Sequence, residues 1–191
     1  MVARQMKRSC HSQQKDSTMP STERPESQCE LTIRSLADLD RFAAALAASL
    51  PTTAVVTLEG DLGAGKTTLV KAVAAAIGID PATVTSPTFG LIHLHDTADG
   101  SLRIVHADMY RLSDVSELHE LGWEDAIAVA PGCRCWAFVE WPQRIGPALP
   151  AERLNISLTI TGETSRRLTL TGAGDQYTTI PQAFLERPTC D

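Results

Sequence analysis

Residues 54–67 read AVVTLEGDLGAGKT, and this stretch decides the fold. Ala54–Leu58 is a continuous apolar run with β-branched residues, which is typical of a strand buried on both faces. Gly60–Gly65 is a glycine-rich turn, and Lys66–Ile77 predicts a helix that ends at Gly78. A strand, a glycine-rich turn and a helix in this order indicate an α/β domain, with the turn at the edge of its sheet.

The turn matches the pattern G-x-x-x-x-G-K-[S/T] in the strand-to-helix context that a phosphate-binding loop requires. Glycine permits positive φ angles and a close approach of backbone N–H groups to an anion, and the helix N-terminus adds partial positive charge. We therefore expect Lys66 to reach the β and γ phosphates of a nucleotide and Thr67 to ligate Mg²⁺. The residues of the expected loop are Gly60, Asp61, Leu62, Gly63, Ala64, Gly65, Lys66 and Thr67.

Two acidic residues stand at the ends of further predicted strands. Asp108 follows residues 102–107, and Glu140 follows residues 136–139. The carboxyl ends of strands face the ligand in an open α/β sheet, so either strand, placed beside the loop strand, would bring its carboxylate near the Mg²⁺. For a single acid, a helix cap or a solvated loop is the alternative. The sequence does not assign a catalytic base between the two.

Weaker signals surround this set. Thr88 lies in the segment 86–89 (SPTF), and a hydroxyl there would suit a γ-phosphate sensor, although an ordinary Ser/Thr turn is the simpler interpretation. His93, His95 and His106 lack a closed set of zinc ligands and indicate sheet or core histidines. Trp123 and Trp141 could contact nucleotide or a partner, but buried anchors are the simpler interpretation. Cys133 and Cys135 have no second cysteine pair to complete a zinc site.

The length of 191 residues fits one domain with tails. Residues 1–30 are polar, with few aliphatic side chains, and predict a disordered tail; a transit peptide, or a true start at Met19, are the alternatives. The domain is expected over residues 31–172 and a C-terminal tail over 173–191. Inside the domain we expect the following elements: strands 31–34, 91–95 and 102–107, a helix capped by Ser35 and Asp38, a strand at 136–139, and an antiparallel hairpin of 154–160 with 167–170.

Composition narrows the function further. The net charge is −6 and no run of Lys or Arg is dense, which disfavours autonomous DNA binding. No apolar run reaches the ~18 residues of a membrane span, and residues 1–30 contain no stretch typical of a signal peptide. Five scattered cysteines indicate a reducing compartment rather than a disulfide framework. The cytoplasm is therefore the expected location.

Five motifs occur in a fixed order along the chain: Gly60–Thr68 (GDLGAGKTT), Ser86–Phe89 (SPTF), His106–Leu112 (HADMYRL), Glu117–Gly122 (ELHELG) and Val139–Pro142 (VEWP). Together they resemble the bacterial TsaE (YjeE) ATPases, which assist formation of threonylcarbamoyladenosine at position 37 of tRNA. The resemblance extends over roughly residues 31–172. It implies a P-loop NTPase-like three-layer α/β fold, with a mostly parallel central sheet and an antiparallel C-terminal extension.

The resemblance also implies roles for individual residues. ATP and Mg²⁺ would be the cofactors, with Lys66 and Thr67 holding them and the binding stretch reaching Thr68. Thr88 would belong to a switch-like loop, while Asp108 and Glu140 would serve as catalytic carboxylates and metal ligands. Tyr110 and Arg111 are expected on a partner surface. The implied partners are TsaD, which performs the transfer, and TsaB, with tRNA reached only indirectly through the complex.

Other nucleotide enzymes fit less well. A GTPase needs an Asn-Lys-x-Asp base reader, but Asn155 is the only asparagine and no lysine follows it. A small-molecule kinase usually adds a lid with arginines, for which Arg134 and Arg144 are the only candidates. A scaffold that binds ATP without hydrolysis remains an alternative, since no arginine finger is evident. We expect slow hydrolysis by the chain alone and faster hydrolysis with partners.

Overall fold

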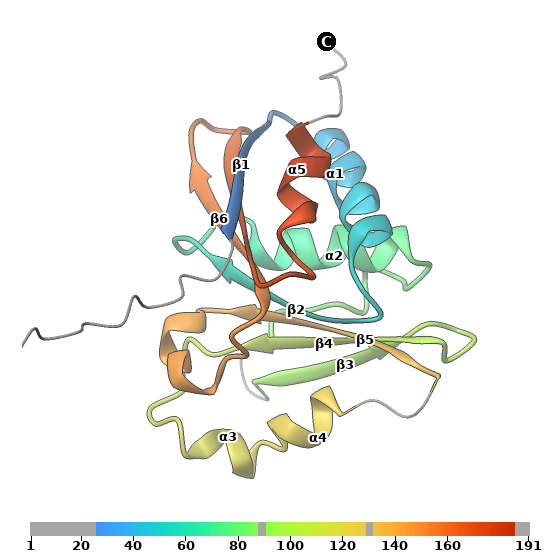
Figure 1. The fold of residues 1–191 in the computed structure, drawn as a ribbon, viewed down its shortest axis with the longest axis vertical. Coiled ribbons are helices and arrows are strands. Elements are labelled where there is room, and N and C mark those ends of the chain that lie inside the picture. Colours follow the sequence, from blue (N-terminus) through green and yellow to red (C-terminus); the bar gives the residue numbers. More distant parts are fainter. Residues whose placement is uncertain (1–25, 88–90, 129–131, 186–191) are drawn as a thin grey trace, which may run out of the picture.

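The computed structural model describes residues 26–87, 91–128 and 132–185. Within them, one sheet has the strand order β1-β7-β6-β2-β5-β4-β3 (Figure 1). The strands are β1 (Glu26–Ile33), β2 (Thr53–Glu59), β3 (Ile92–Asp96), β4 (Leu102–Asp108), β5 (Arg134–Glu140), β6 (Arg153–Ile160) and β7 (Arg166–Ala173). The expected α/β fold is therefore confirmed.

The sheet has a parallel centre and antiparallel edges. Strands β6, β2, β5 and β4 run parallel to one another, whereas β1 and β7 extend one edge and β3 the other in antiparallel pairs. The predicted hairpin is the pair β6–β7, and the predicted pair of strands before it is β3–β4. Because β2 lies between β5 and β6, the glycine-rich turn leaves from the middle of the parallel centre.

Helices cover both faces of this sheet. They are α1 (Leu36–Ser49), α2 (Lys66–Ala76), α3 (Glu117–Glu120), α4 (Trp123–Ile127) and α5 (Thr179–Leu185), with short 3₁₀ turns at Pro142–Arg144 and Gly146–Ala148. Figure 1 shows α1, α2 and α5 on one side of the sheet and α3 and α4 on the other, which gives the expected three layers. Over the described ranges, no helix combines the length and the apolar composition that a membrane span requires.

Helix α1 begins at the predicted cap. The Ser35 side chain accepts a hydrogen bond from the Asp38 N–H at 3.1 Å, and the Asp38 carboxylate accepts one from the Arg34 N–H at 2.8 Å. The first bond satisfies a donor that the first turn would otherwise leave without a partner, and the second ties the residue before the cap to the same turn. The cap thereby fixes where the chain turns from β1 into the helix.

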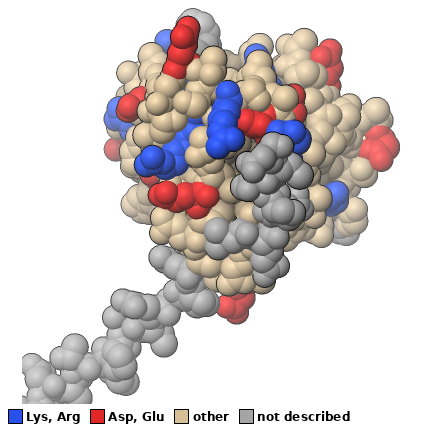
Figure 2. Space-filling view, turned by 90° about the horizontal axis from the view of Figure 1, so that it is seen from above, with Lys and Arg blue, Asp and Glu red and all other residues tan. Residues whose placement is uncertain are grey.

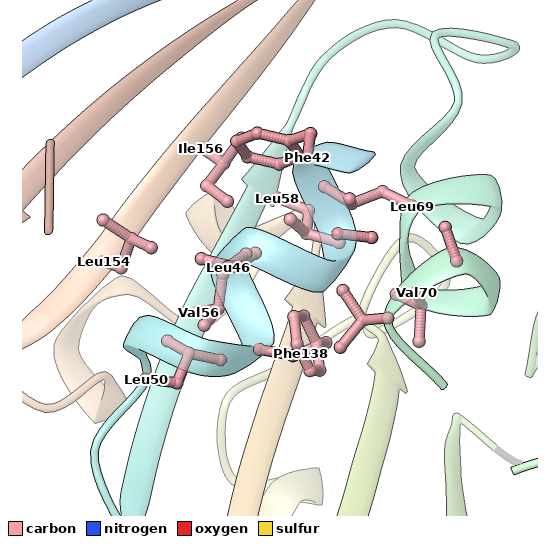
Figure 3. Packing of buried hydrophobic residues seen from close by; sticks show 14 of the residues in the cluster. Phe42, Leu46, Leu50, Val56, Leu58, Leu69, Val70, Phe138, Leu154 and Ile156 are labelled. Carbon is pink, nitrogen blue, oxygen red and sulfur yellow. The ribbon is translucent and has the colours of Figure 1, made fainter. Parts of the chain in front are cut away.

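Two hydrophobic clusters hold the layers together. In the larger one, Phe42 and Leu46 of α1 and Leu69 of α2 pack over the sheet residues Leu58 and Phe138 (Figure 3). The second lies under α3 and α4 and contains Trp123 of α4, which confirms its interpretation as a buried anchor. Burial on both faces explains why β2 and β5 read as continuous apolar runs.

The ends of the domain differ from the expected boundaries. Strand β1 starts at Glu26 instead of residue 31, and its whole length pairs with β7. Beyond residue 172, α5 packs against β1 and β7. Strand β1 lies at a sheet edge and carries few apolar residues, and α5 is a helix of only 7 residues, so both sequences resemble tails. The disorder predicted for residues 1–25 and the end of the C-terminal tail fall outside the described residues.

Helix α5 should contribute to stability. The Phe184 ring is buried, 5.1 Å from the ring of Phe42 between centroids. We expect Phe184→Ala to lower the free energy of unfolding by about 3 kcal/mol, since it removes a buried aromatic ring. Urea denaturation measures this, with the exposed neighbour Gln182→Ala as the control. Equal stability of the two variants would show that α5 does not belong to the folded domain.

Candidate nucleotide-binding site

The glycine-rich turn lies between the end of β2 and the start of α2. Gly65, which caps α2, has φ of +108°, a value that favours glycine. A Cβ atom on Gly60 would lie 2.5 Å from the Leu158 carbonyl oxygen of β6, so the backbone approach itself requires glycine. The turn therefore has the conformation and the location that the phosphate-loop motif predicts.

Lys66 is buried inside this loop, with 4% of its surface exposed. Its Nζ donates hydrogen bonds to the carbonyl oxygens of Gly60 at 2.8 Å and Asp61 at 3.0 Å. Burial lowers the pKa of Lys66, while neighbouring carboxylates, chiefly that of Glu140, oppose this shift. The lysine is thus a partly desolvated cation that the loop already holds in place.

The two predicted carboxylates lie side by side. Strand β5 is the direct neighbour of β2 and sets Glu140 opposite Leu58, while β4 sets Asp108 opposite Glu140. Glu140 is 3% exposed and Asp108 9%. Strands β4 and β5 both end with a carboxylate at the same edge of the sheet. Only β5, which carries Glu140, pairs directly with β2, the strand that precedes the loop.

Glu140 contacts the helix that follows the loop. Its Oε1 atom accepts a hydrogen bond from the Thr67 hydroxyl at 2.7 Å and lies 2.9 Å from His106 Nε2. The structure therefore joins two of the predicted metal ligands directly. It also adds His106, which the sequence indicated only as a core or sheet histidine.

Asp108 connects the site to the segment that contains Thr88. Its Oδ2 accepts a hydrogen bond from the Ser86 hydroxyl at 2.9 Å, and its Oδ1 accepts one from the Tyr110 N–H at 3.1 Å. Thr88 itself lies outside the described residues, so its predicted switch role stays a prediction. Ser86 is a hydroxyl of this segment that the sequence analysis did not single out.

An aromatic pair borders the loop. Trp141 directly follows Glu140 at φ of +58°, and its ring centroid lies 4.3 Å from Lys66 Nζ, which is a cation–π geometry. Tyr110 packs against Trp141 in a tilted arrangement, with ring centroids 4.8 Å apart, and is 51% exposed. Trp141 is accordingly a half-buried part of the site, and the prediction of a simple buried anchor was wrong for it.

One arginine reaches the loop from the β6–β7 hairpin. Arg166 Nε donates to the Ala64 carbonyl at 3.0 Å, and its Nη1 donates to Ser165 at 2.9 Å and Gly162 at 3.1 Å within the hairpin. The sequence offered only Arg134 and Arg144 as nearby arginines. Arg166 was missed because β6 pairs with β2, and this pairing returns the hairpin to the loop.

A cavity of about 780 Å³ opens between the loop, the start of α1 and the β6–β7 hairpin. Leu158 and Leu168 give it apolar walls, and Thr68 of α2 also lines it. Arg34 and Arg166 add two positive charges and Glu163 one negative charge. Figure 2, seen from above Figure 1, shows Lys and Arg side chains close together on this end of the molecule. An anionic ligand would meet local positive charge there although the chain is acidic overall.

Comparison with known proteins decides the family. The family model described as "Threonylcarbamoyl adenosine biosynthesis protein TsaE" matches residues 33–168. The chain belongs to the TsaE family. The resemblance predicted from the five motifs is thereby confirmed.

Individual TsaE relatives agree with this assignment. The tRNA threonylcarbamoyladenosine biosynthesis protein TsaE of Bacillus subtilis is 42% identical over 123 residues, covering 64% of this chain and 72% of the relative. Its counterpart in Treponema pallidum is 32% identical over 137 residues, covering 72% and 96%. The crystal structure of Bacillus subtilis YdiB superposes with a TM-score of 0.63 at 30% identity, covering 84% of this chain and 96% of that one.

The TsaE match includes every site residue described above and ends before α5. Among the described residues, no group of three or more His, Cys, Asp and Glu side chains is arranged to hold a metal ion. Nucleotide sites usually bind Mg²⁺ through one or two carboxylates together with phosphate oxygens, and a loop Ser or Thr hydroxyl. The oxygen donors of Thr67, Glu140 and Asp108 fit that kind of site better than a zinc centre.

Proposed function

We propose that this chain is a Mg²⁺-dependent ATPase of tRNA threonylcarbamoyladenosine biosynthesis. It acts in the cytoplasm with TsaD and TsaB and reaches tRNA only through that complex. The observation that carries the proposal is the convergence of Lys66, Thr67 and Glu140 at one phosphate-type loop. Membership of the TsaE family supports a role in threonylcarbamoyladenosine biosynthesis, and the loop motif supports binding of a nucleoside triphosphate.

Each polar group of the site has a distinct part in this proposal. Lys66 supplies the cation that faces the β and γ phosphates, and the loop N–H groups bind their oxygens. Thr67, Glu140 and Asp108 would hold Mg²⁺, which, when bound, neutralises charge on the phosphates. Glu140 and Asp108 are also the groups able to orient a water molecule or accept its proton.

The cavity beside the loop suits the nucleoside half of ATP. Its volume lies within the range of small-molecule sites, and its mixture of apolar walls and a few polar groups is typical of them. Because Gly65 and Thr68 line both the loop and the cavity, one nucleotide can occupy the two together. A base would then lie between α1 and the β6–β7 hairpin.

Arg166 should support nucleotide binding by holding the loop backbone. We expect Arg166→Ala to raise the Kd for Mg-ATP about tenfold, or ~1.4 kcal/mol, because the loop backbone loses the hydrogen bond at Ala64 that orders it before nucleotide binds. A smaller effect on kcat is expected, since Arg166 contacts loop carbonyls instead of the carboxylates. Titration with a fluorescent ATP analogue measures the Kd. Arg167→Ala, an exposed neighbour, is the control, and equal Kd values for both variants would reject the role.

Hydrolysis by the chain alone should be slow. P-loop catalysis depends on positive charge placed against the transferring phosphoryl group, often from an arginine. The Arg166 guanidinium is engaged by carbonyls of the loop and the hairpin and is not placed to supply that charge. A partner protein that completes the site would therefore accelerate turnover.

Multiple-turnover formation of threonylcarbamoyladenosine tests the proposed function. TsaD, TsaB, tRNA and the threonylcarbamoyl donor are mixed with and without this chain and ATP, and the modified nucleoside is measured by mass spectrometry. We expect sustained product formation only when the chain and a hydrolysable ATP are both present. Equal turnover with a non-hydrolysable analogue would favour the scaffold alternative, and phosphate transferred to an added small molecule would favour a kinase.

A further inference from the structure

His106 is a buried polar residue at the carboxyl end of β4, with none of its surface exposed. In the strand register it lies opposite His93 of β3 and Phe138 of β5. Its Nε2 atom is 2.9 Å from Glu140 Oε1. Its Nδ1 atom has no hydrogen-bond partner in the part of the chain that the structure describes. Burying a polar atom without a hydrogen bond is unfavourable, so the buried ring of His106 requires an explanation.

The hydrogen bonds available to His106 indicate which of its two ring nitrogens carries the proton. A proton on Nε2 donates to the Glu140 carboxylate, whereas a proton on Nδ1 would leave a buried donor unpaired and two lone pairs facing each other across 2.9 Å. The Nε2–H tautomer is therefore the one that the surroundings favour.

Two donors meet at a single oxygen of Glu140. The Thr67 hydroxyl binds Oε1 from the loop helix at 2.7 Å, and His106 binds the same atom from the neighbouring strand. Thr67 is also a proposed Mg²⁺ ligand, so its hydroxyl must serve two partners once nucleotide is present. His106 lies within the sheet and is not a proposed Mg²⁺ ligand, so its bond to Glu140 is its one proposed role.

We propose that His106 is a positioning residue, which holds the Glu140 carboxylate by an Nε2–H hydrogen bond in the orientation that ATP hydrolysis requires. This inference rests on the proposed function and adds to it a residue that touches neither the loop nor the phosphates. His106 acts through Glu140, in the way that hydrogen-bond partners of metal-site carboxylates fix the orientation of those carboxylates.

Three substitutions separate positioning from simple packing. In His106→Gln the amide nitrogen occupies about the place of Nε2, in His106→Asn it falls short near Nδ1, and His106→Leu removes it. We expect His106→Leu and His106→Asn to lower kcat about tenfold to a hundredfold with little change in nucleotide Kd, and His106→Gln to recover most of the activity. The assay uses the full chain with its partner proteins, and Kd is measured with a fluorescent ATP analogue.

A double-mutant cycle tests whether His106 acts through Glu140. In a Glu140→Gln background, His106→Leu should lower kcat by less than about twofold, because the carboxylate to be positioned is already gone. Independent, multiplicative losses would overturn the proposal, as would equal kcat values for the Leu, Asn and Gln variants.

A spectroscopic readout keeps the test independent of activity. In the ¹⁵N-histidine-labelled wild-type chain, the His106 ring should carry its proton on Nε2, and Glu140→Gln should shift that proton signal. Protonation on Nδ1 would overturn the proposal. A wild-type chain that hydrolyses no ATP would reject the proposed function together with the catalytic part of this inference, whereas wild-type hydrolysis with unaffected His106 variants would reject this inference alone.

Discussion

Replacing Lys66 with alanine should remove most ATP affinity or turnover, by a factor on the order of a hundred to a thousand. Lys66 Nζ is held at 2.8 Å and 3.0 Å by two loop carbonyls, so the cation is in place before nucleotide arrives. Its removal leaves the loop without its principal positive charge, opposite the carboxylates of Glu140 and Asp108. Both the Kd for Mg-ATP and the hydrolysis rate are to be measured.

The matched control for this variant is Lys71→Ala in the same helix. Both variants lose one lysine charge, but only Lys66 bonds to the loop carbonyls. Thermal unfolding of the two variants shows whether either loss of charge disturbs the fold. Wild-type binding and hydrolysis by Lys66→Ala would contradict the assignment of residues 60–67 as a phosphate loop.

Glu140→Gln should leave nucleotide binding nearly intact and lower hydrolysis about a hundredfold, within the range for a lost general acid–base group. The glutamine oxygen can still accept the hydrogen bonds of Thr67 and His106, so the shape of the site is kept. What is lost is the negative charge next to Lys66 and the capacity to accept a proton. A steady-state hydrolysis assay measures kcat and a binding titration measures Kd, so the effects on the two can be separated.

Glu59→Gln supplies the control for that loss of charge. Glu59 ends β2 beside the loop and is exposed, whereas Glu140 is buried against Thr67 and His106. The Glu59 variant should hydrolyse ATP like the wild-type chain. If Glu140→Gln did so as well, Glu140 would have a structural role and Asp108 would be the remaining candidate base.

The local parts of the site could be predicted from the sequence. The loop conformation depends on glycines and a lysine within eight residues, so the motif at residues 60–67 carries its own geometry. Asp108 and Glu140 were predicted because each follows a predicted strand, and the carboxyl ends of parallel strands meet at one edge. The α/β class followed from the alternation of strands and helices, and the three-layer architecture from the resemblance to the TsaE family.

What could not be predicted depends on strand order. The sequence does not say that β5, and not β4, is the neighbour of β2, and this order makes Glu140 the partner of Thr67. Arg166 contacts Ala64 across about a hundred residues through the β6–β2 pairing, and nothing local to Arg166 indicates it. His106 lies beside Glu140 because β4 is the neighbour of β5, which is also a matter of strand order.

Edge elements were also missed. The residues of β1 before Leu31 are mostly polar because an edge strand needs little apolar surface, so the sequence resembles a tail although Cys29 is buried. Helix α5 has only 7 residues and contains Pro181, yet Phe184 packs on Phe42. A periodic pattern is too short to recognise in either segment.

We propose above that this chain is an ATPase whose site is completed by its partners. The most direct measurement is Mg²⁺-dependent ATP hydrolysis by the chain alone and with purified TsaB and TsaD, with Lys66→Ala as the blank. We expect slow hydrolysis by the chain alone, strong stimulation by the two partners together, and loss of both activities in Lys66→Ala. Full-speed hydrolysis by the isolated chain, unchanged by partners, or hydrolysis that survives in Lys66→Ala, would contradict it.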